Sequence, residues 1–226
     1  FELGMNNFNE ISTLSKLVQP NIAIITNISE AHIGNFNSIK DIIKAKAEIF
    51  NGLKSDGYIL INNDHYYDEI IKYTKNYSKS NVLTYGANKK ADIRLVNRNQ
   101  SNNGQKITAE ADGKIYKYEV SLDGQHQAVN SLAVIGSLML ANCDINKGLS
   151  NLDKITLPTG RGAKYHLLIK GEESILIDDT YNANLSSMIA SLHSLNEIAK
   201  SNRKVLIFGE MGELGVFSES LHNKLY

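Results

Sequence analysis

The stretch NIAIIT, residues 21–26, is a continuous apolar run with polar residues at both ends. Such a run predicts a strand that is buried on both faces, as in a parallel sheet. Similar runs follow at 58–62 and 82–85, and helical patterns at 38–53 and 64–77 alternate with them. This alternation predicts an α/β fold with a mostly parallel central sheet that is covered by helices.

The pattern becomes strand-like from residue 91 to residue 122. Within this region Asp112-Gly113 separates two strand-like runs, and this dipeptide favours a hairpin turn. We therefore expect an antiparallel hairpin appended to the sheet. A helical pattern returns at 124–141.

A candidate linker, PTGRG, occupies residues 158–162. Beyond it, runs at 174–178, 184–200 and 204–208 predict a strand, a helix and a strand, which is the start of a Rossmann-like domain. The sequence thus predicts two domains, 1–158 and 159–226.

The chain has 226 residues, with 24 Lys and Arg balanced by 24 Asp and Glu. This balance gives no sign of a nucleic-acid footprint or of a patch that binds a membrane surface. The single Cys143 has no partner for an internal disulfide, and no run is apolar and long enough to insert into a membrane. These features favour a cytoplasmic protein. Residues 1–3 read as the end of a strand, and a helix from Ser218 has no stop signal, so we expect a segment of a longer protein.

Lys46 is the most informative single residue. On a helix over 38–53, at about 100° per residue, it lies in the middle of an apolar stripe formed by Ile39, Ile42, Ile43, Ile49 and Phe50. One interpretation is that the lysine extends its charge to water along its methylene stem. The other is a buried functional lysine with a lowered pKa, whose neutral amine can add carbon dioxide. The resulting carbamate would be a hard ligand for Mg²⁺.

Polar residues follow three of the predicted strands, at the edge where parallel sheets bind ligands. They are Asn27, Glu30 and His32; Asp178, Asp179, Asn182 and Asn184; and Glu210 and Glu213. Glu2 closes a further short apolar stretch. Each alone reads as a turn or a helix cap, Asn184 in particular. Together they predict a shared site.

Short motifs in a fixed order extend through almost the whole chain. They are ELGMN (2–6), TNI (26–28) with His32, KAKAEIF (44–50), GQH (124–126) with NSLA (130–133), GRG (160–162), DDTYNAN (178–184) and GEMGELG (209–215). In this order the chain resembles the ATP-dependent Mur ligases, with the central domain over 1–158 and the start of the C-terminal domain over 159–226.

The resemblance implies a role for each matching position. Glu2 and His32 would bind a metal ion together with a carbamylated Lys46. His126 would bind the nucleotide, and Asn130 would lie near the adenine, Arg161 near the ATP phosphates and Asp179 near the nucleotide. Asn182, Asn184 and Glu213 would face the substrate. Lys46, His32, Arg161 and Asp179 would be the catalytic set.

The resemblance also implies the chemistry. ATP and Mg²⁺ would activate a substrate carboxylate as an acyl phosphate, which an amine then attacks. The stretch YNAN (181–184) favours the branch of the family that joins D-alanyl-D-alanine to UDP-N-acetylmuramoyl-tripeptide. Members of this kind are expected to be monomers, without nucleic-acid partners.

One departure from the family pattern is large. The glycine-rich phosphate loop ending in Gly-Lys-Thr or Gly-Lys-Ser does not occur here, and GRGAK (160–164) has the wrong spacing for it. We therefore expect the chain by itself to be inactive. A non-catalytic remnant remains an alternative. A ligase of folylpolyglutamate type is a further one, which the YNAN stretch disfavours.

Overall fold

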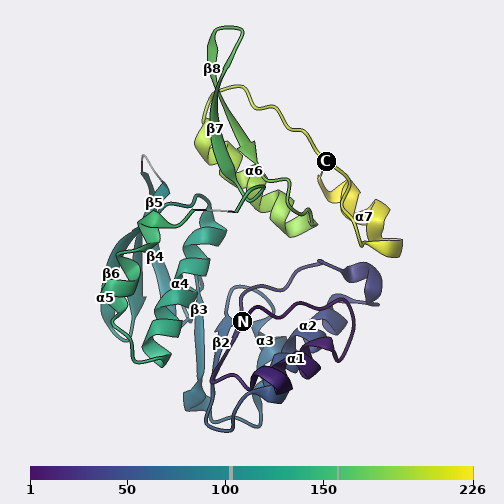
Figure 1. Cartoon of the computed structure of the whole chain (residues 1–226), viewed down its shortest axis with the longest axis vertical. Helices are drawn as coiled ribbons and strands as arrows, with labels where there is room; N and C mark the ends of the chain where they lie inside the picture. Colours follow the sequence, from purple (N-terminus) through teal and green to yellow (C-terminus); the bar gives the residue numbers. More distant parts are fainter. Residues whose placement is uncertain (102–103, 157, 226) are drawn as a thin grey trace.

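The computed structural model describes residues 1–226 except 102–103, 157 and 226. Residues 1–155, here called the sheet part, contain a six-stranded sheet, and residues 158–225, the hairpin part, contain a two-stranded one. In Figure 1 the hairpin part lies above the sheet part, and the chain passes between them once.

The six strands of the large sheet lie side by side in the order of the sequence. They are β1 (Ile22–Ile25), β2 (Tyr58–Asn62), β3 (Val82–Gly86), β4 (Ile93–Ser101), β5 (Gly104–Ala111) and β6 (Lys114–Val120). Pairing is parallel from β1 to β4 and antiparallel from β4 to β6. This confirms the predicted mostly parallel sheet with an antiparallel appendage.

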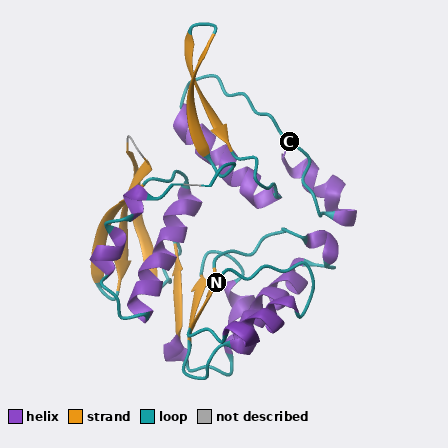
Figure 2. Ribbon diagram, in the orientation of Figure 1, coloured by secondary structure: helices purple, strands orange, loops and turns teal. Residues whose placement is uncertain are grey.

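Helices cover both faces of the parallel strands (Figure 2). Ile59 and Ile61 of β2 pack in one core cluster with the helix that carries Ile42, while Leu60 packs in a second cluster with Leu132. Alternate residues of a strand point to opposite faces. The apolar runs are therefore continuous because both faces are buried.

The helices of the sheet part include one short piece that was expected to be longer. They are α1 (Glu10–Val18), α2 (Ile39–Ala47), α3 (Tyr67–Ile70), α4 (Gln125–Leu140) and α5 (Ile145–Leu149), with 3₁₀ turns η1 (Ile33–Asn35), η2 (Glu48–Gly52), η3 (Ile71–Thr74), η4 (Lys79–Asn81) and η5 (Leu152–Lys154). The helix expected over 64–77 forms only α3 and η3, and at its expected start the Asp64 carboxylate instead accepts from the Ala87 and Asn88 N–H groups at 2.9 and 2.8 Å. Asp64 thus anchors the loop after β3 rather than starting a helix.

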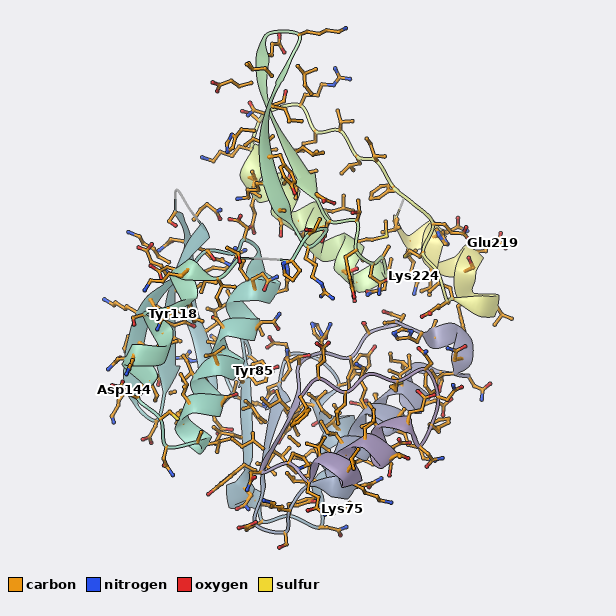
Figure 3. The ribbon with its side chains drawn as sticks, viewed as in Figure 1. Lys75, Tyr85, Tyr118, Asp144, Glu219 and Lys224 are labelled. Carbon is orange, nitrogen blue, oxygen red and sulfur yellow. The ribbon has the colours of Figure 1, made fainter. Side chains whose placement is uncertain are left out.

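The predicted hairpin turn is confirmed, since Asp112 and Gly113 both have positive φ, 49° and 68°. Two buried tyrosines, labelled in Figure 3, form hydrogen bonds from the sheet to a helix and to the end of another strand. Tyr118 on β6 lies 2.7 Å from the Ser131 hydroxyl of α4, and burial raises its pKa to about 12. Tyr85 on β3 donates to the Thr26 carbonyl at 3.2 Å, at the end of β1.

The hairpin part differs from the predicted strand–helix–strand unit. Its elements are β7 (Ala163–Ile169), β8 (Glu172–Asp178), α6 (Leu185–Ala199), η6 (Gly215–Phe217), α7 (Ser218–His222) and η7 (Asn223–Leu225). β8 pairs antiparallel with β7. Residues 204–208, predicted as a strand, form none, and Val205 to Phe208 are exposed. An apolar run becomes a strand only where another strand pairs with it, and no described strand lies beside this one.

Residues 1–3 were expected to end a strand, and this is also wrong, since they belong to no element. Among the helices of the described residues, none combines the length and the apolar character that crossing a membrane requires.

Candidate active site at the junction of the two parts

The loop after β1 meets the segment before α7 at backbone level. Gly34 donates from its N–H to the Glu213 carbonyl at 2.8 Å. A Cβ on Gly34 would lie 2.7 Å from both that oxygen and the Gly215 nitrogen, which no real side chain allows. Gly34 and Gly215 thus let two loops, far apart in sequence, pack directly on each other.

The same contact brings two of the predicted site residues together. The His32 imidazole faces the Glu213 carboxylate through Nδ1. The packing beneath them is apolar, because Met211, Leu214 and Leu221 belong to the same core cluster as Ile33 and Phe36. The junction is therefore a continuous part of the core, and the contact between His32 and Glu213 lies at its margin.

Two ion pairs also join the parts. Arg98 on β4 pairs with Glu197 on α6 through both terminal guanidinium nitrogens, and the bond raises the pKa of Arg98 and lowers that of Glu197. Lys164 on β7 pairs with Asp123, directly before α4. The two parts are thus joined by charge at two places, apart from the contact between His32 and Glu213.

Lys46 is half-buried on α2, between the buried Ala45 and Ala47. Burial lowers the pKa of its amine. Within the described residues, no hydrogen bond or ion pair reaches that amine. The predicted stripe is confirmed, and its lysine is partly removed from water without a counter-ion among the described residues.

The N-terminus of α4 forms the other side of the junction. Gln105, fully buried on β5, donates to the Leu122 and Gly124 carbonyls at 2.8 Å each and so fixes the start of the helix. Gly124 has φ 89° and lies against Ser194 of α6, which leaves no room for a side chain. His126 in the first turn has its pKa lowered by burial and, to a lesser degree, by Arg98, while Asp179 raises it.

Arg161 lies on a loop that is held to the end of β8. The Tyr181 N–H donates to Gly160 at 2.9 Å, and the Gly162 N–H donates to Asp178 at 2.7 Å. The guanidinium lies 4.1 Å from the centre of the Tyr181 ring, a cation–π contact. Between two anchored glycines and over an aromatic face, Arg161 is held ready to bind an anion.

The remaining predicted residues have local roles or stand apart. Asn184 caps α6 by accepting from the Ser187 N–H at 3.0 Å. Asn182 accepts from its neighbour Ala183 at 2.8 Å. Asp179 accepts from the Ser191 hydroxyl on α6. Glu2 and Asn130 are exposed.

Comparisons with known proteins agree along the whole chain. Residues 1–138 match the model of the Mur ligase middle domain, and residues 167–226 match that of the Mur ligase, glutamate ligase domain. The chain belongs to the Mur ligase family. It is 35% identical over 226 residues to the UDP-N-acetylmuramoyl-tripeptide–D-alanyl-D-alanine ligase of Rickettsia prowazekii, covering 100% of this chain and 49% of that protein.

Two solved structures show how far the fold of this Mur ligase chain is shared. A crystal structure of MurF from Acinetobacter baumannii superposes with a TM-score of 0.90 at 26% identity, covering 100% of this chain and 48% of that one. MurF ligase from Thermotoga maritima in complex with ADP superposes with a TM-score of 0.84 at 22% identity, which shows the fold alone, over 99% of this chain and 50% of that one. The chain thus spans about half the length of the curated relatives it matches.

In this Mur ligase chain the predicted metal ligands do not form a ready site of ordinary ligands. Among the described residues, no three His, Cys, Asp or Glu side chains are grouped to hold a metal ion. The chemistry still fits Mg²⁺ if Lys46 carries a carbamate, because its desolvated amine is suited to add carbon dioxide and would then supply two oxygens. His32 would add a ring nitrogen and Glu2 a carboxylate.

Sequence reasoning missed several residues of the site. Glu48 belongs to a quoted motif, yet its carboxylate accepts from the Asn9 N–H at 2.8 Å and from the Ser12 N–H at 3.2 Å, so it caps α1. Tyr181 lay inside another motif, and its contact with Arg161 depends on a loop fold that no spacing reveals. The role of Gln105 could not be predicted, because the sequence does not distinguish a strand glutamine with a buried side chain from one with an exposed side chain.

Proposed function

We propose that the protein containing this chain is an ATP-dependent ligase of peptidoglycan precursor synthesis. It joins D-alanyl-D-alanine to UDP-N-acetylmuramoyl-tripeptide through an acyl-phosphate intermediate. The observation that supports this most is identity over the whole chain, across both parts, to ligases that carry this name. We further propose a cytoplasmic, monomeric protein, with the domain boundary between residues 158 and 159.

The chain would supply two groups of residues to the reaction. Arg161, held over Tyr181, would bind the phosphates of ATP, and neutral His126, Asn130 and Asp179 would bind the nucleoside side. These residues come from both parts, so the nucleotide would be bound only when the parts are docked. Asn182 and Asn184, on the loop before α6, are the proposed substrate side.

Glu2, His32 and the Lys46 carbamate would hold Mg²⁺. The metal ion would offset phosphate charge as the acyl phosphate forms. Metal binding would depend on carbamylation of Lys46, since the unmodified amine has no oxygen atom that could bind Mg²⁺. His32 would present one ring nitrogen while the other faces Glu213.

The full-length protein tests this function directly. We expect phosphate release from ATP that requires both UDP-N-acetylmuramoyl-tripeptide and D-alanyl-D-alanine, and a loss of about 100-fold or more when Arg161 is replaced by Ala. The 226-residue chain alone should release none. If phosphate release required glutamate and a folate instead of D-alanyl-D-alanine, the proposed substrates would be wrong.

A further inference from the structure

The contact between His32 and Glu213 joins two residues that both have unusual backbones. His32 has φ 61° and Glu213 has φ 60°. The left-handed region is sparsely populated by residues other than glycine, and it persists where the surroundings enforce it. Here the surroundings are the Gly34 N–H bond to the Glu213 carbonyl and the glycine contact beside it. Both side chains are therefore directed by the docking of the two parts.

The chemistry of the pair determines which ring nitrogen of His32 is free. The Nδ1 atom of His32 is buried beside the Glu213 carboxylate, and the described residues offer it no other hydrogen-bond partner. Because a carboxylate only accepts hydrogen bonds, bonding there requires a proton on Nδ1. In a neutral imidazole the proton is then absent from Nε2, which keeps its lone pair. Metal-bound histidines commonly have this arrangement, in which a carboxylate fixes the ring from the opposite side.

We infer that Glu213 is a positioning residue for the metal site: it holds His32 in the Nδ1–H form and aims Nε2 at the cation. The inference rests on the proposed function, in which His32 binds Mg²⁺. It gives Glu213 a different role from the substrate contact expected from the resemblance. It also makes the metal site depend on docking, because His32 belongs to the sheet part and Glu213 to the hairpin part.

The test uses the 226-residue chain with bicarbonate present and Mn²⁺ as the probe. Glu213→Asn suits it, because asparagine tolerates the left-handed backbone but is too short to reach the ring. Glu210→Asn, at an exposed carboxylate of the same loop, is the matched control. Mn²⁺ binding is measured by electron paramagnetic resonance, and the ring form of His32 by nitrogen-15 NMR, assigned with His32→Gln. The Gly34 amide signal reports whether the loops stay docked.

We expect Glu213→Asn to weaken Mn²⁺ binding by about 10- to 100-fold and to remove the preference of His32 for Nδ1–H, while Glu210→Asn changes neither. Unchanged affinity and an unchanged ring form, with Gly34 still docked, would overturn the inference. A His32→Gln chain that binds Mn²⁺ as well as the original, or an original chain that does not bind it, would show instead that the proposed metal site is wrong. Loss of affinity in His32→Gln but not in Glu213→Asn would reject the positioning role alone.

Discussion

At the scale of the residue, Lys46 places a charged amine on the apolar, partly buried stripe of α2. Burial lowers the pKa of its amine from 10.5, the value of an unburied lysine. The fold therefore bears the cost of a desolvated charge at every pH below the lowered pKa. That cost declines as the pH rises through the lowered pKa and is gone above about 10.5.

Lys46→Met keeps the apolar stem and removes the charge. We expect it to raise the melting temperature at pH 7 in buffer free of carbon dioxide, by about 2–4 °C for each 1 kcal/mol recovered. The gain should shrink toward pH 10. Lys40→Met, on the exposed face of the same helix, is the control and should leave the melting temperature unchanged. A lower melting temperature for Lys46→Met would mean that the amine has a stabilising partner.

The position of Lys46 could be predicted from sequence, because helical periodicity alone places it on the apolar stripe. The pairing of His32 with Glu213 could not, since the two residues are separated by most of the chain and meet through a glycine contact. Of the polar residues that were expected at one edge of a parallel sheet, only Asn27, Glu30 and His32 follow a strand of that sheet, because β8 lies in a separate sheet and residues 204–208 form no strand. The sequence pattern also did not reveal which of these residues, such as Asn184, cap a helix.

At the scale of the element, α1 depends on a carboxylate from a distant turn. Glu48 accepts from the N–H groups of Asn9 and Ser12, which are the N-cap and the third residue of the helix. These are the donors that a helix leaves unsatisfied at its start. The helix is therefore tied to η2 as well as to the core.

Glu48→Ala should lower the free energy of unfolding by about 1 kcal/mol, the usual cost of a lost cap. Thermal unfolding measures this. Asp56→Ala, at an exposed carboxylate soon after η2, should have no effect. An equal loss in both variants would show that net charge, and not capping, is responsible.

Gly34→Ala tests the contact between the loops. The added methyl group would overlap the Glu213 carbonyl and the Gly215 nitrogen, and we expect overpacking to cost about 1–3 kcal/mol of docking. Hydrogen exchange at the amides of 211–217 should then accelerate. Gly212→Ala, where an added Cβ would meet no atom within 4 Å, should leave exchange unchanged. Equal protection in both variants would contradict the role given to this contact.

Element types were predictable where the periodicity was long, as in α4, and where turn chemistry was specific, as at Asp112-Gly113. The absence of a strand at 204–208 could not be predicted, because a strand forms only by pairing with another strand and the local sequence does not show whether a partner is present. The helix predicted over 64–77 was wrong in its extent for a different reason. Asp64 had a bonding partner on another loop that competed with helix formation.

At the scale of the whole molecule, ion pairs at two places join the two parts, Arg98 with Glu197 and Lys164 with Asp123. Each is partly exposed, so each contributes about 0–1 kcal/mol and weakens in salt. The bond from Arg98 lowers the pKa of Glu197 below 4.5. Its contribution to docking is therefore present above about pH 4.5 and is lost as the pH falls through the lowered pKa.

Arg98→Glu should loosen the docking of the two parts, because two glutamates would then face each other. We expect a larger radius of gyration by small-angle X-ray scattering at low salt. Adding Glu197→Arg should restore the compact form by reversing the pair. Arg94→Glu, in an ion pair within the sheet part, is the control and should not change the radius. Failure of the double variant to recover would mean that the pair does not couple the parts.

The change from parallel to antiparallel pairing at β4 has a consequence for how the chain folds. The strands β4, β5 and β6 follow one another closely in the sequence, whereas a helix lies between β1 and β2 and another between β2 and β3. Contacts between residues close in sequence form sooner, because less chain entropy is lost in closing the loop. We therefore expect pulse-labelling hydrogen exchange to protect β5 and β6 before β1 and β2. The antiparallel strands β4 to β6 would then be the template on which the β1–β2 edge of the sheet is completed last.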